Sequence, residues 1–386
     1  MMSNSAFPTP LKGDNHSIFI RSGSSKLVIF FSAINMKENQ FNFWQLGREI
    51  DENVIFVNDP SNQWYLNGIP SLGTSLDKTM VCLKNWIDHL EVEEIYTVGT
   101  SMGGHAAIHY GIELNANILS FPAEIILREQ HSRSIQNLER DIVKKEFLLE
   151  KIENFDKTIH MIIGESTPKD LINAGYIRGF ENVKVYSLLG TDHYVPSVIS
   201  RSSKLYTLLM KFVSTGMIEK ELFSNLGNFN LYDDELFADL AKAHQNFGSA
   251  NFDKAIFYAK RILITFPAFE SALYMVGDSY LQKEEYQLAM SYLARAIIVA
   301  PNNADYLFKY SHALRMLDDK KSSLHILDTL IQKFPNYARA YYARGNMQIE
   351  EGNELKALES FKLAFSLNNK NEKFEKRYLK LRHKLK

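Results

Sequence analysis

Short apolar runs, rich in β-branched and aromatic residues, alternate with segments of helical periodicity between residues 15 and 214. The runs predict strands, and the periodic segments predict helices. We expect strands at 18–21, 26–32, 54–57, 94–98, 118–121, 158–164 and 183–188. We expect helices at 43–50, 76–90, 104–112, 134–152, 171–180 and 197–213. This alternation predicts an α/β domain with a mostly parallel sheet that helices cover on both faces.

Beyond Gly216 the strand pattern stops and a period of 34 residues begins. That period is typical of tetratricopeptide repeats, each of which is a pair of helices. Prolines recur at this interval, at Pro267, Pro301 and Pro335. Small residues recur at the same interval, at Ala255, Ala289, Ser323 and Ala357. We expect four repeats over residues 236–369, the third of them degenerate because serines replace the small apolar residues.

The end of the chain, residues 371–386, places apolar side chains on one helical face, which predicts a helix that covers the open end of the repeats. From Lys370 onward there are eight Lys or Arg and two acidic residues. This excess of positive charge fits a solvated cap, and alternatively an anionic surface or partner. The expected division is a sheet domain at 1–216, a linker at 217–235 and a repeat domain at 236–386.

Composition narrows the functional classes. The 386 residues are 45% hydrophobic with a formal net charge of -1, which gives no electrostatic reason to expect a nucleic acid partner. Cys82 is the only cysteine and fits a reducing compartment. The N-terminus lacks the pattern of a signal peptide, and no apolar run is long enough to span a bilayer. We expect a cytoplasmic protein.

One motif carries candidate chemistry: Gly99-x-Ser101-x-Gly103, between the strand expected at 94–98 and the helix expected at 104–112. In a nucleophile elbow of this kind, a serine lies on a sharp turn between strand and helix. The two glycines let the strand and helix approach closely, and the helix N-terminus directs backbone N–H groups at the reacting oxygen. The motif therefore predicts Ser101 as a nucleophile.

A serine nucleophile needs a base and an acid, in the chain order Ser, acid, His. His193 follows the last expected strand, where the base belongs. Glu165 and Asp170 both follow the strand expected at 158–164, and either is a candidate acid. We favour Asp170, because a loop of some length is needed to reach His193. His105 and His109, on the helix after Ser101, are interpreted as packing or surface groups.

The oxyanion formed during acyl transfer needs two preorganised donors. We expect the N–H of Met102, the residue after the nucleophile, and an N–H from the loop after strand 26–32, at Ala33 or its neighbour. Trp64 and Tyr65 have flat faces that suit a sugar ring, and ordinary packing is an equal alternative for them. The sequence has no P-loop and no cysteine-based metal site, so we expect neither a cofactor nor a metal.

Gly99-Thr100-Ser101-Met102-Gly103-Gly104, together with Gly190-Thr191-Asp192-His193, resembles the α/β-hydrolase superfamily over residues 15–215. The second half resembles tetratricopeptide repeat proteins. The first domain also looks like bacterial esterase-like proteins of surface-glycan biosynthesis, including the accessory secretion acetyltransferase-like group. The resemblance implies a serine esterase or acyltransferase that acts on an ester or acylated glycan through Ser101, His193 and Asp170.

Two functions from different classes therefore stand side by side. The first is a serine hydrolase or acyltransferase whose repeats bind a protein, a peptide or another copy of the chain. The second is a catalytically inactive hydrolase-fold scaffold that serves protein interaction. A peptidase is disfavoured only because such enzymes are less common among proteins of this type.

Overall fold

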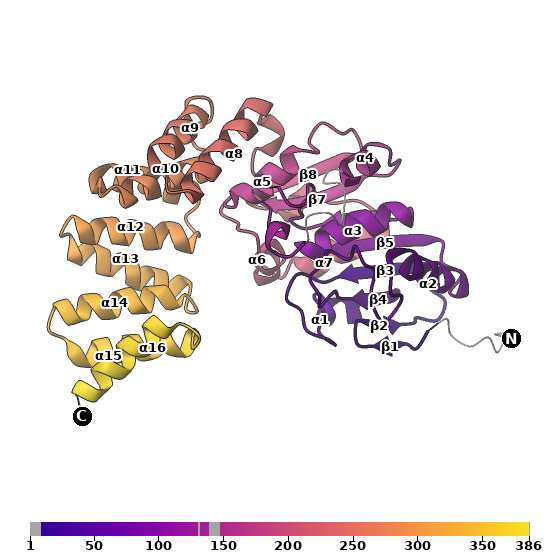
Figure 1. The fold of residues 1–386 in the computed structure, drawn as a ribbon, viewed down its shortest axis with the longest axis horizontal. Helices are drawn as coiled ribbons and strands as arrows, with labels where there is room; N and C mark the ends of the chain where they lie inside the picture. The colour runs from indigo at the N-terminus through magenta and orange to yellow at the C-terminus, as the bar shows by residue number, and fades with distance from the viewer. Residues whose placement is uncertain (1–8, 130–131, 139–146, 386) are drawn as a thin grey trace. The chain divides into compact units, whose positions relative to one another are not determined.

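The computed structural model describes residues 9–129, 132–138 and 147–385 (Figure 1). The chain divides into two compact units, Met1–Ala241 and Lys242–Lys386. Strands and helices make up the first unit, and the described part of the second unit is helical.

The first unit is built on an eight-stranded sheet with the order β1-β2-β4-β3-β5-β6-β7-β8. The ladders from β4 through β8 are parallel, whereas β1 pairs with β2, and β2 with β4, in antiparallel fashion. The sheet is therefore mixed, with the parallel part that the sequence predicted. The strands are β1 (Lys12–Gly13), β2 (His16–Phe19), β3 (Lys26–Phe31), β4 (Asn53–Val57), β5 (Glu94–Gly99), β6 (Asn117–Ser120), β7 (Ile159–Gly164) and β8 (Val183–Leu188).

Helices of the first unit follow the expected order, with two differences. The helix expected at 197–213 is broken into two, because Ser203 adopts a left-handed conformation with φ 57°. The helix expected at 134–152 is a 3₁₀ turn, Ser134–Gln136, and a later helix, and residues 139–146 lie outside the described part. The helices are α1 (Trp44–Arg48), α2 (Leu76–His89), α3 (Met102–Glu113), α4 (Phe147–Glu153), α5 (Pro168–Gly175), α6 (Val195–Arg201) and α7 (Leu205–Thr215).

Apolar side chains pack on both faces of the sheet. Successive residues of a strand point to opposite faces, so the continuous apolar run of β3 supplies two cores. Leu27, Ile29 and Phe31 pack in one cluster with residues of α2 and α3. Val28 and Phe30 pack in the other cluster with residues of α7. The loops at the carboxyl ends of the central strands are thereby fixed on a rigid layer.

The segment expected to be a linker, 217–235, belongs to the first unit. Phe223, Phe229 and Tyr232 are buried, and Leu226 forms an isolated bridge with Leu188 at the end of β8. Two 3₁₀ turns, Lys220–Leu222 and Phe229–Leu231, shape the segment. The boundary lies later than the sequence indicated, because these apolar residues complete the core rather than connect two cores.

Helices continue in antiparallel pairs through the second half of the chain, as the repeat period predicts. In the degenerate third repeat the small-residue position holds Ser323, whose hydroxyl donates to the Ser311 carbonyl at 2.7 Å, so the polar group is satisfied although it is buried. The helices are α8 (Asp234–Gly248), α9 (Phe252–Thr265), α10 (Glu270–Gln282), α11 (Tyr286–Val299), α12 (Ala304–Met316), α13 (Lys320–Lys333), α14 (Ala338–Glu350), α15 (Glu354–Leu367) and α16 (Glu372–Lys384).

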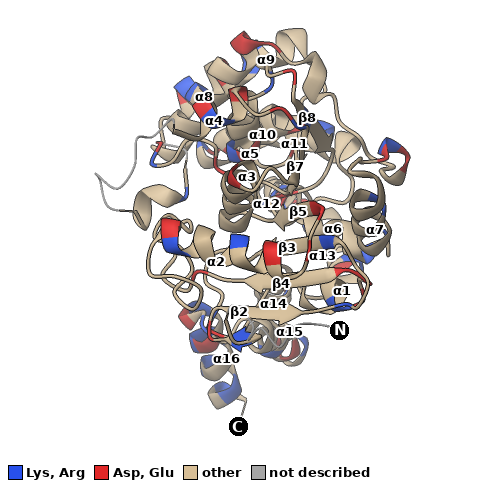
Figure 2. Cartoon of the chain, turned by 90° about the vertical axis from the view of Figure 1, so that its right-hand side faces the viewer, with Lys and Arg blue, Asp and Glu red and all other residues tan. Residues whose placement is uncertain are grey.

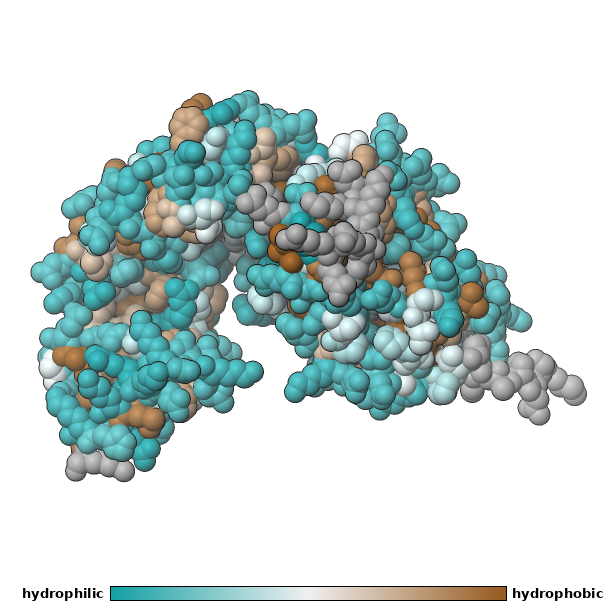
Figure 3. All heavy atoms as spheres, in the orientation of Figure 1, coloured by the Kyte–Doolittle hydropathy of each residue, from teal (hydrophilic) through white to brown (hydrophobic). Residues whose placement is uncertain are grey.

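Hydrophilic residues dominate the face of the molecule in Figure 3, and the apolar residues on it form small separate groups. Among the described residues, no helix combines the length and the apolar character that crossing a membrane requires.

Candidate functional site

Ser101 lies at the turn between β5 and α3, with φ 57° and ψ -121°. Residues other than glycine occupy this region of backbone space only where the surrounding structure enforces it. A Cβ on Gly99 would lie 1.9 Å from the Gly103 carbonyl oxygen, and a Cβ on Gly103 would lie 2.2 Å from that of Phe31. Both glycines are therefore required by close backbone packing, and that packing holds Ser101 in its strained conformation.

His193 and Asp170 form a buried pair. The Nδ1 atom of His193 lies 2.8 Å from Oδ1 and 2.9 Å from Oδ2 of Asp170, and both side chains are less than a tenth exposed. When the ring is neutral and carries its hydrogen on Nδ1, it donates to the carboxylate, and Nε2 is its acceptor nitrogen. Among the described residues, the buried Nε2 has no hydrogen-bond partner. The carboxylate thus fixes the orientation of the ring.

One pocket brings these residues together with the serine. Its lining is Trp64, Ser101, Met102, Ala123, Glu124, Arg133, Lys169, Asp170, Asn173 and His193. The cavity that these residues enclose has a volume of about 10 Å³, roughly the space of one water molecule. The space beside Ser101 is therefore nearly filled by the side chains of its lining.

Glu165, the other candidate acid, has partners of its own. Its carboxylate accepts from Ser187 Oγ at 2.5 Å, from the Tyr232 hydroxyl at 2.8 Å and from the Asn228 N–H at 3.0 Å. Burial raises the pKa of this carboxyl, and the three donors oppose that rise. Glu165 thus joins the ends of β7 and β8 to the segment after α7. The structure brings Asp170 to the histidine and gives Glu165 this structural position.

Of the two backbone N–H groups expected to bind the oxyanion, one belongs to a residue that lines the pocket and the other donates to a protein side chain. Met102 lines the pocket, at the first turn of α3. The N–H of Ala33 instead donates to the Asn42 side-chain oxygen at 2.7 Å, so it is already occupied. The expectation for Ala33 is corrected on this ground, because an N–H with a protein acceptor is not free for an oxyanion.

Trp64 and Tyr65 are neighbours with different surroundings. Trp64 lines the pocket. Tyr65 is fully buried in the core, where its hydroxyl accepts from the Ser32 N–H at 2.8 Å and donates to the Ser32 carbonyl at 2.9 Å. The expectation that Tyr65 contacts a substrate is corrected, because its ring and its hydroxyl serve packing.

Several pocket residues were not anticipated: Ala123, Glu124, Arg133, Lys169 and Asn173. Glu124 accepts from the backbone N–H groups of Arg133 and Ser134, and Asn173 accepts from the N–H of Ile125, so both fix the loop after β6. No sequence motif marks these positions, since they reach the pocket only through tertiary packing. Within the described residues, no group of three His, Cys, Asp or Glu side chains is placed to hold a metal ion.

His105 and His109 are packing groups inside α3, and they make the stability of the first unit depend on pH. Burial lowers their pKa values from 6.5 to about 4 and about 3. As the pH falls below 6.5, the unfolded chain gains protons that the folded chain does not, so stability falls. At pH 5 the loss is about 2 kcal/mol for each histidine.

Urea unfolding at pH 7 and pH 5 checks this expectation. His105→Gln should reduce the difference between the two pH values by about 2 kcal/mol, whereas a variant of the exposed His383, His383→Gln, should leave it unchanged. An unchanged difference in His105→Gln would show that this histidine is protonated in the folded state.

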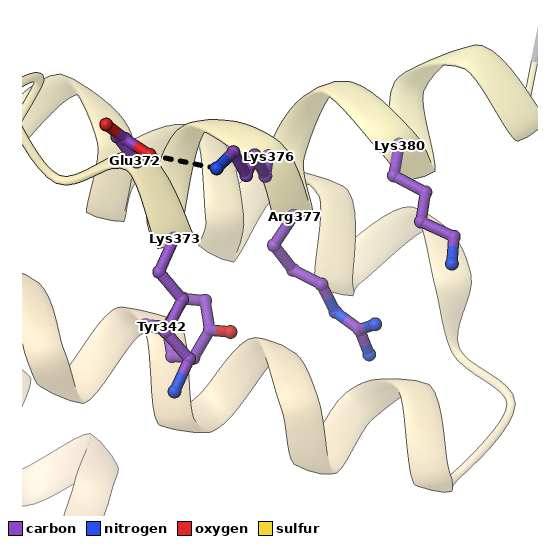
Figure 4. Close-up of a pocket in the computed structure, with 6 residues that line it drawn as sticks. All are labelled: Tyr342, Glu372, Lys373, Lys376, Arg377 and Lys380. Carbon is purple, nitrogen blue, oxygen red and sulfur yellow. Dashed lines mark hydrogen bonds and ion pairs between the residues drawn. The ribbon is translucent and has the colours of Figure 1, made fainter.

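A second pocket lies on the repeats, between α14 and α16 (Figure 4). Lys373, Arg377 and Lys380 point from α16 toward α14, and the Lys373 ammonium lies 5.4 Å from the centre of the Tyr342 ring. Lys376 forms an ion pair with Glu372 at 2.9 Å. Lys and Arg recur along α16 (Figure 2). The pocket therefore combines an aromatic wall with an excess of positive charge.

Residues 270–303 and 338–371 match the sequence model of the tetratricopeptide repeat. These segments are the second and fourth helix pairs, on either side of the degenerate third pair. The second half of the chain thus contains tetratricopeptide repeats. Such repeats form extended surfaces for protein partners, so this half is a protein-interaction module.

Similar proteins cover only part of the chain. DnaJ homolog subfamily C member 7 of Mus musculus is 28% identical over 102 residues, which are 26% of this chain and 21% of that protein. Its Homo sapiens counterpart is 26% identical over 102 residues, with the same coverage. The chain therefore spans about 21% of the length of these curated relatives.

Two solved structures are also similar in part. A crystal structure of MamA is 24% identical and covers 33% of this chain and 74% of its own, with a TM-score of 0.31. The first tetratricopeptide repeat domain of Spaghetti (RPAP3), bound to an HSP90 peptide, is 16% identical and covers 30% of this chain and 92% of its own, with a TM-score of 0.29.

Proposed function

We propose that the first unit is a serine hydrolase or acyltransferase of the α/β-hydrolase type, and that the repeats bind its protein partner. One observation carries the enzymatic part: the Asp170–His193 pair holds an unpartnered Nε2 on the pocket that Ser101 also lines. A nucleophile, an oriented base and an acid are the groups that acyl transfer through serine requires.

The proposed mechanism uses these groups in order. The Ser101 oxygen attacks the acyl carbon, and its proton passes to Nε2 of His193. Asp170 stabilises the imidazolium that forms, while the N–H of Met102 binds the developing oxyanion. His193 then protonates the leaving group, and the acyl-enzyme passes its acyl group to water or to a sugar hydroxyl. The lining carries two basic residues, Arg133 and Lys169, and two acidic residues, Glu124 and Asp170, so its formal charge selects neither an anionic nor a cationic acceptor.

The substrate class follows from the narrowness of the pocket. The cavity beside Ser101 is about 10 Å³, so an acyl group enters only when side chains of the lining move, and the smallest acyl groups require the least movement. We therefore propose acetyl-sized groups on an ester or glycan as the substrate class. The cytoplasmic location expected from the composition belongs to the same proposal.

Protein binding without catalysis is the second candidate, and the repeat matches favour it independently of the pocket. In this case the first unit is an inactive hydrolase-type scaffold. A fluorophosphonate probe separates the two candidates, because it labels a serine that a neighbouring base activates and leaves an inert serine unlabelled. We expect labelling of the full-length chain. A chain that stays unlabelled and turns over no short ester would be a binding protein.

We expect the partner of the repeats to carry an acidic segment, because the pocket between α14 and α16 has an excess of positive charge. A fluorescein-labelled, glutamate-rich peptide should bind the full chain, and Lys373→Glu combined with Lys380→Glu should weaken binding about tenfold or more. The matched control is Lys356→Glu combined with Lys362→Glu, two exposed positions on α15. Equal loss in the control would indicate a general effect of net charge and no specific site.

A further inference from the structure

Trp64 is held rigidly beside the pocket by the loop that follows β4. The Asp59 carboxylate accepts from the N–H of Gln63 at 2.7 Å and from the N–H of Tyr65 at 3.0 Å. The Tyr110 hydroxyl donates to the Tyr65 carbonyl at 2.9 Å, which ties the same loop to α3. Trp64 itself has a left-handed backbone with φ 54°. These contacts fix the indole ring between two anchored neighbours.

The indole N–H of Trp64 has no acceptor within the part of the chain that the structure describes, although the residue is only 2% exposed. A buried donor without a partner is rare in folded proteins and requires an explanation. Trp86 provides the comparison within the same unit, because it is also fully buried and its N–H donates to the Thr9 hydroxyl at 3.0 Å. Burial of a tryptophan in this unit is therefore compatible with a satisfied indole N–H.

Two side chains of this pocket carry a buried, unpartnered nitrogen: the acceptor Nε2 of His193 and the donor Nε1–H of Trp64. The attack of a serine on an ester needs both groups. The serine releases a proton, which an acceptor nitrogen can take, and the attack creates a negatively charged oxygen, to which an N–H can donate. Ala33, one of the two backbone donors that the sequence indicated for this oxygen, donates to Asn42 instead. Trp64 supplies a donor without an acceptor among the described residues, and it lines the pocket.

We propose that Nε1–H of Trp64 is the second oxyanion donor, so that a tryptophan side chain replaces a backbone amide. This inference rests on the proposed function. When the Ser101 oxygen bonds to the acyl carbon, its proton moves to His193, and the carbonyl electron pair moves onto the oxygen. That oxygen then accepts from Trp64 and from the N–H of Met102. The substrate is an ester or other acyl compound whose carbonyl oxygen lies against the indole.

Trp64→Phe removes the N–H and keeps an aromatic ring, and Trp86→Phe is the matched control. For a short-chain ester, Trp64→Phe should lower kcat by roughly 10²–10³ with little change in KM, the effect of losing one oxyanion donor. The smaller ring leaves a cavity at a buried position, so both variants should have a lower melting temperature. Trp86→Phe, which also loses its hydrogen bond to Thr9, should keep its kcat.

A replacement of Trp64 by β-(3-benzothienyl)alanine, which keeps the two-ring shape and lacks the N–H, covers the case in which phenylalanine leaves a cavity. It should show the same loss of kcat. If this analogue retains wild-type kcat while Ser101→Ala is inactive, the role of Trp64 is overturned and the proposed function stands. If the unmodified chain neither turns over esters nor reacts with the fluorophosphonate probe, the proposed function fails, and this inference fails with it.

Discussion

Replacing Ser101 by alanine is expected to abolish fluorophosphonate labelling and to lower ester turnover by about 10⁶ in kcat, because the members of a serine triad act as one unit. His193→Ala should cost about as much for the same reason. Folding should be preserved, since the strained turn is enforced by the packing of Gly99 and Gly103 and accepts any small side chain. Steady-state kinetics with a short-chain ester and a thermal melt measure the two effects.

The neighbouring variant Thr100→Ala is the control, because it changes a side chain in the same turn and leaves the serine in place. It should retain labelling and turnover. Residual activity of Ser101→Ala equal to that of the wild type would exclude Ser101 as the nucleophile and would leave the first unit as a scaffold.

The second large effect is expected for Asp170→Asn, with a loss of roughly 10⁴ in kcat. An amide in place of the carboxylate no longer selects the tautomer with hydrogen on Nδ1, so Nε2 of His193 is no longer available as the acceptor. Glu165→Gln is the matched control, because both positions follow β7 and only one contacts the histidine. It should keep kcat.

The effect of Glu165→Gln should instead appear in unfolding experiments, where one of the acceptor oxygens for Ser187, Asn228 and Tyr232 becomes a donor. The reverse pattern, in which Glu165→Gln is inactive and Asp170→Asn is active, would assign the acid to Glu165.

Most of the sheet follows from the sequence because its central strands are continuous apolar runs, such as β3 and β4, which only a doubly covered sheet can bury. The antiparallel edge does not follow, since β1 has two residues and too short a pattern to read. The Asn and Gly residues of the segment at 217–235 indicate a linker. Its buried residues Phe223, Phe229 and Tyr232 reveal their role only when their partners on the sheet are known.

The candidate site likewise has residues that the sequence predicts and residues that it does not. The placement of Ser101, His193 and Asp170 around one pocket is predictable from local motifs and chain order, because the elbow and the loops after the strands have recognisable sequences. The hydrogen bonding of Ala33 and the position of Trp64 depend on tertiary contacts, which no sequence motif indicates. A side chain nine positions away, Asn42, occupies the N–H of Ala33, and the hydrogen bonds of Asp59 decide the conformation of the loop that carries Trp64.

The cluster around Glu165 also has a consequence for biosynthesis. A protein is made from its N-terminus, and its domains fold as units during synthesis. The ends of β7 and β8 receive their hydrogen-bond donors from Asn228 and Tyr232, which are translated after the last strand and after α7. The first unit therefore cannot reach its final state on the ribosome until this segment has emerged. The first unit can therefore complete its fold only when translation has reached α8, the helix with which the repeats begin.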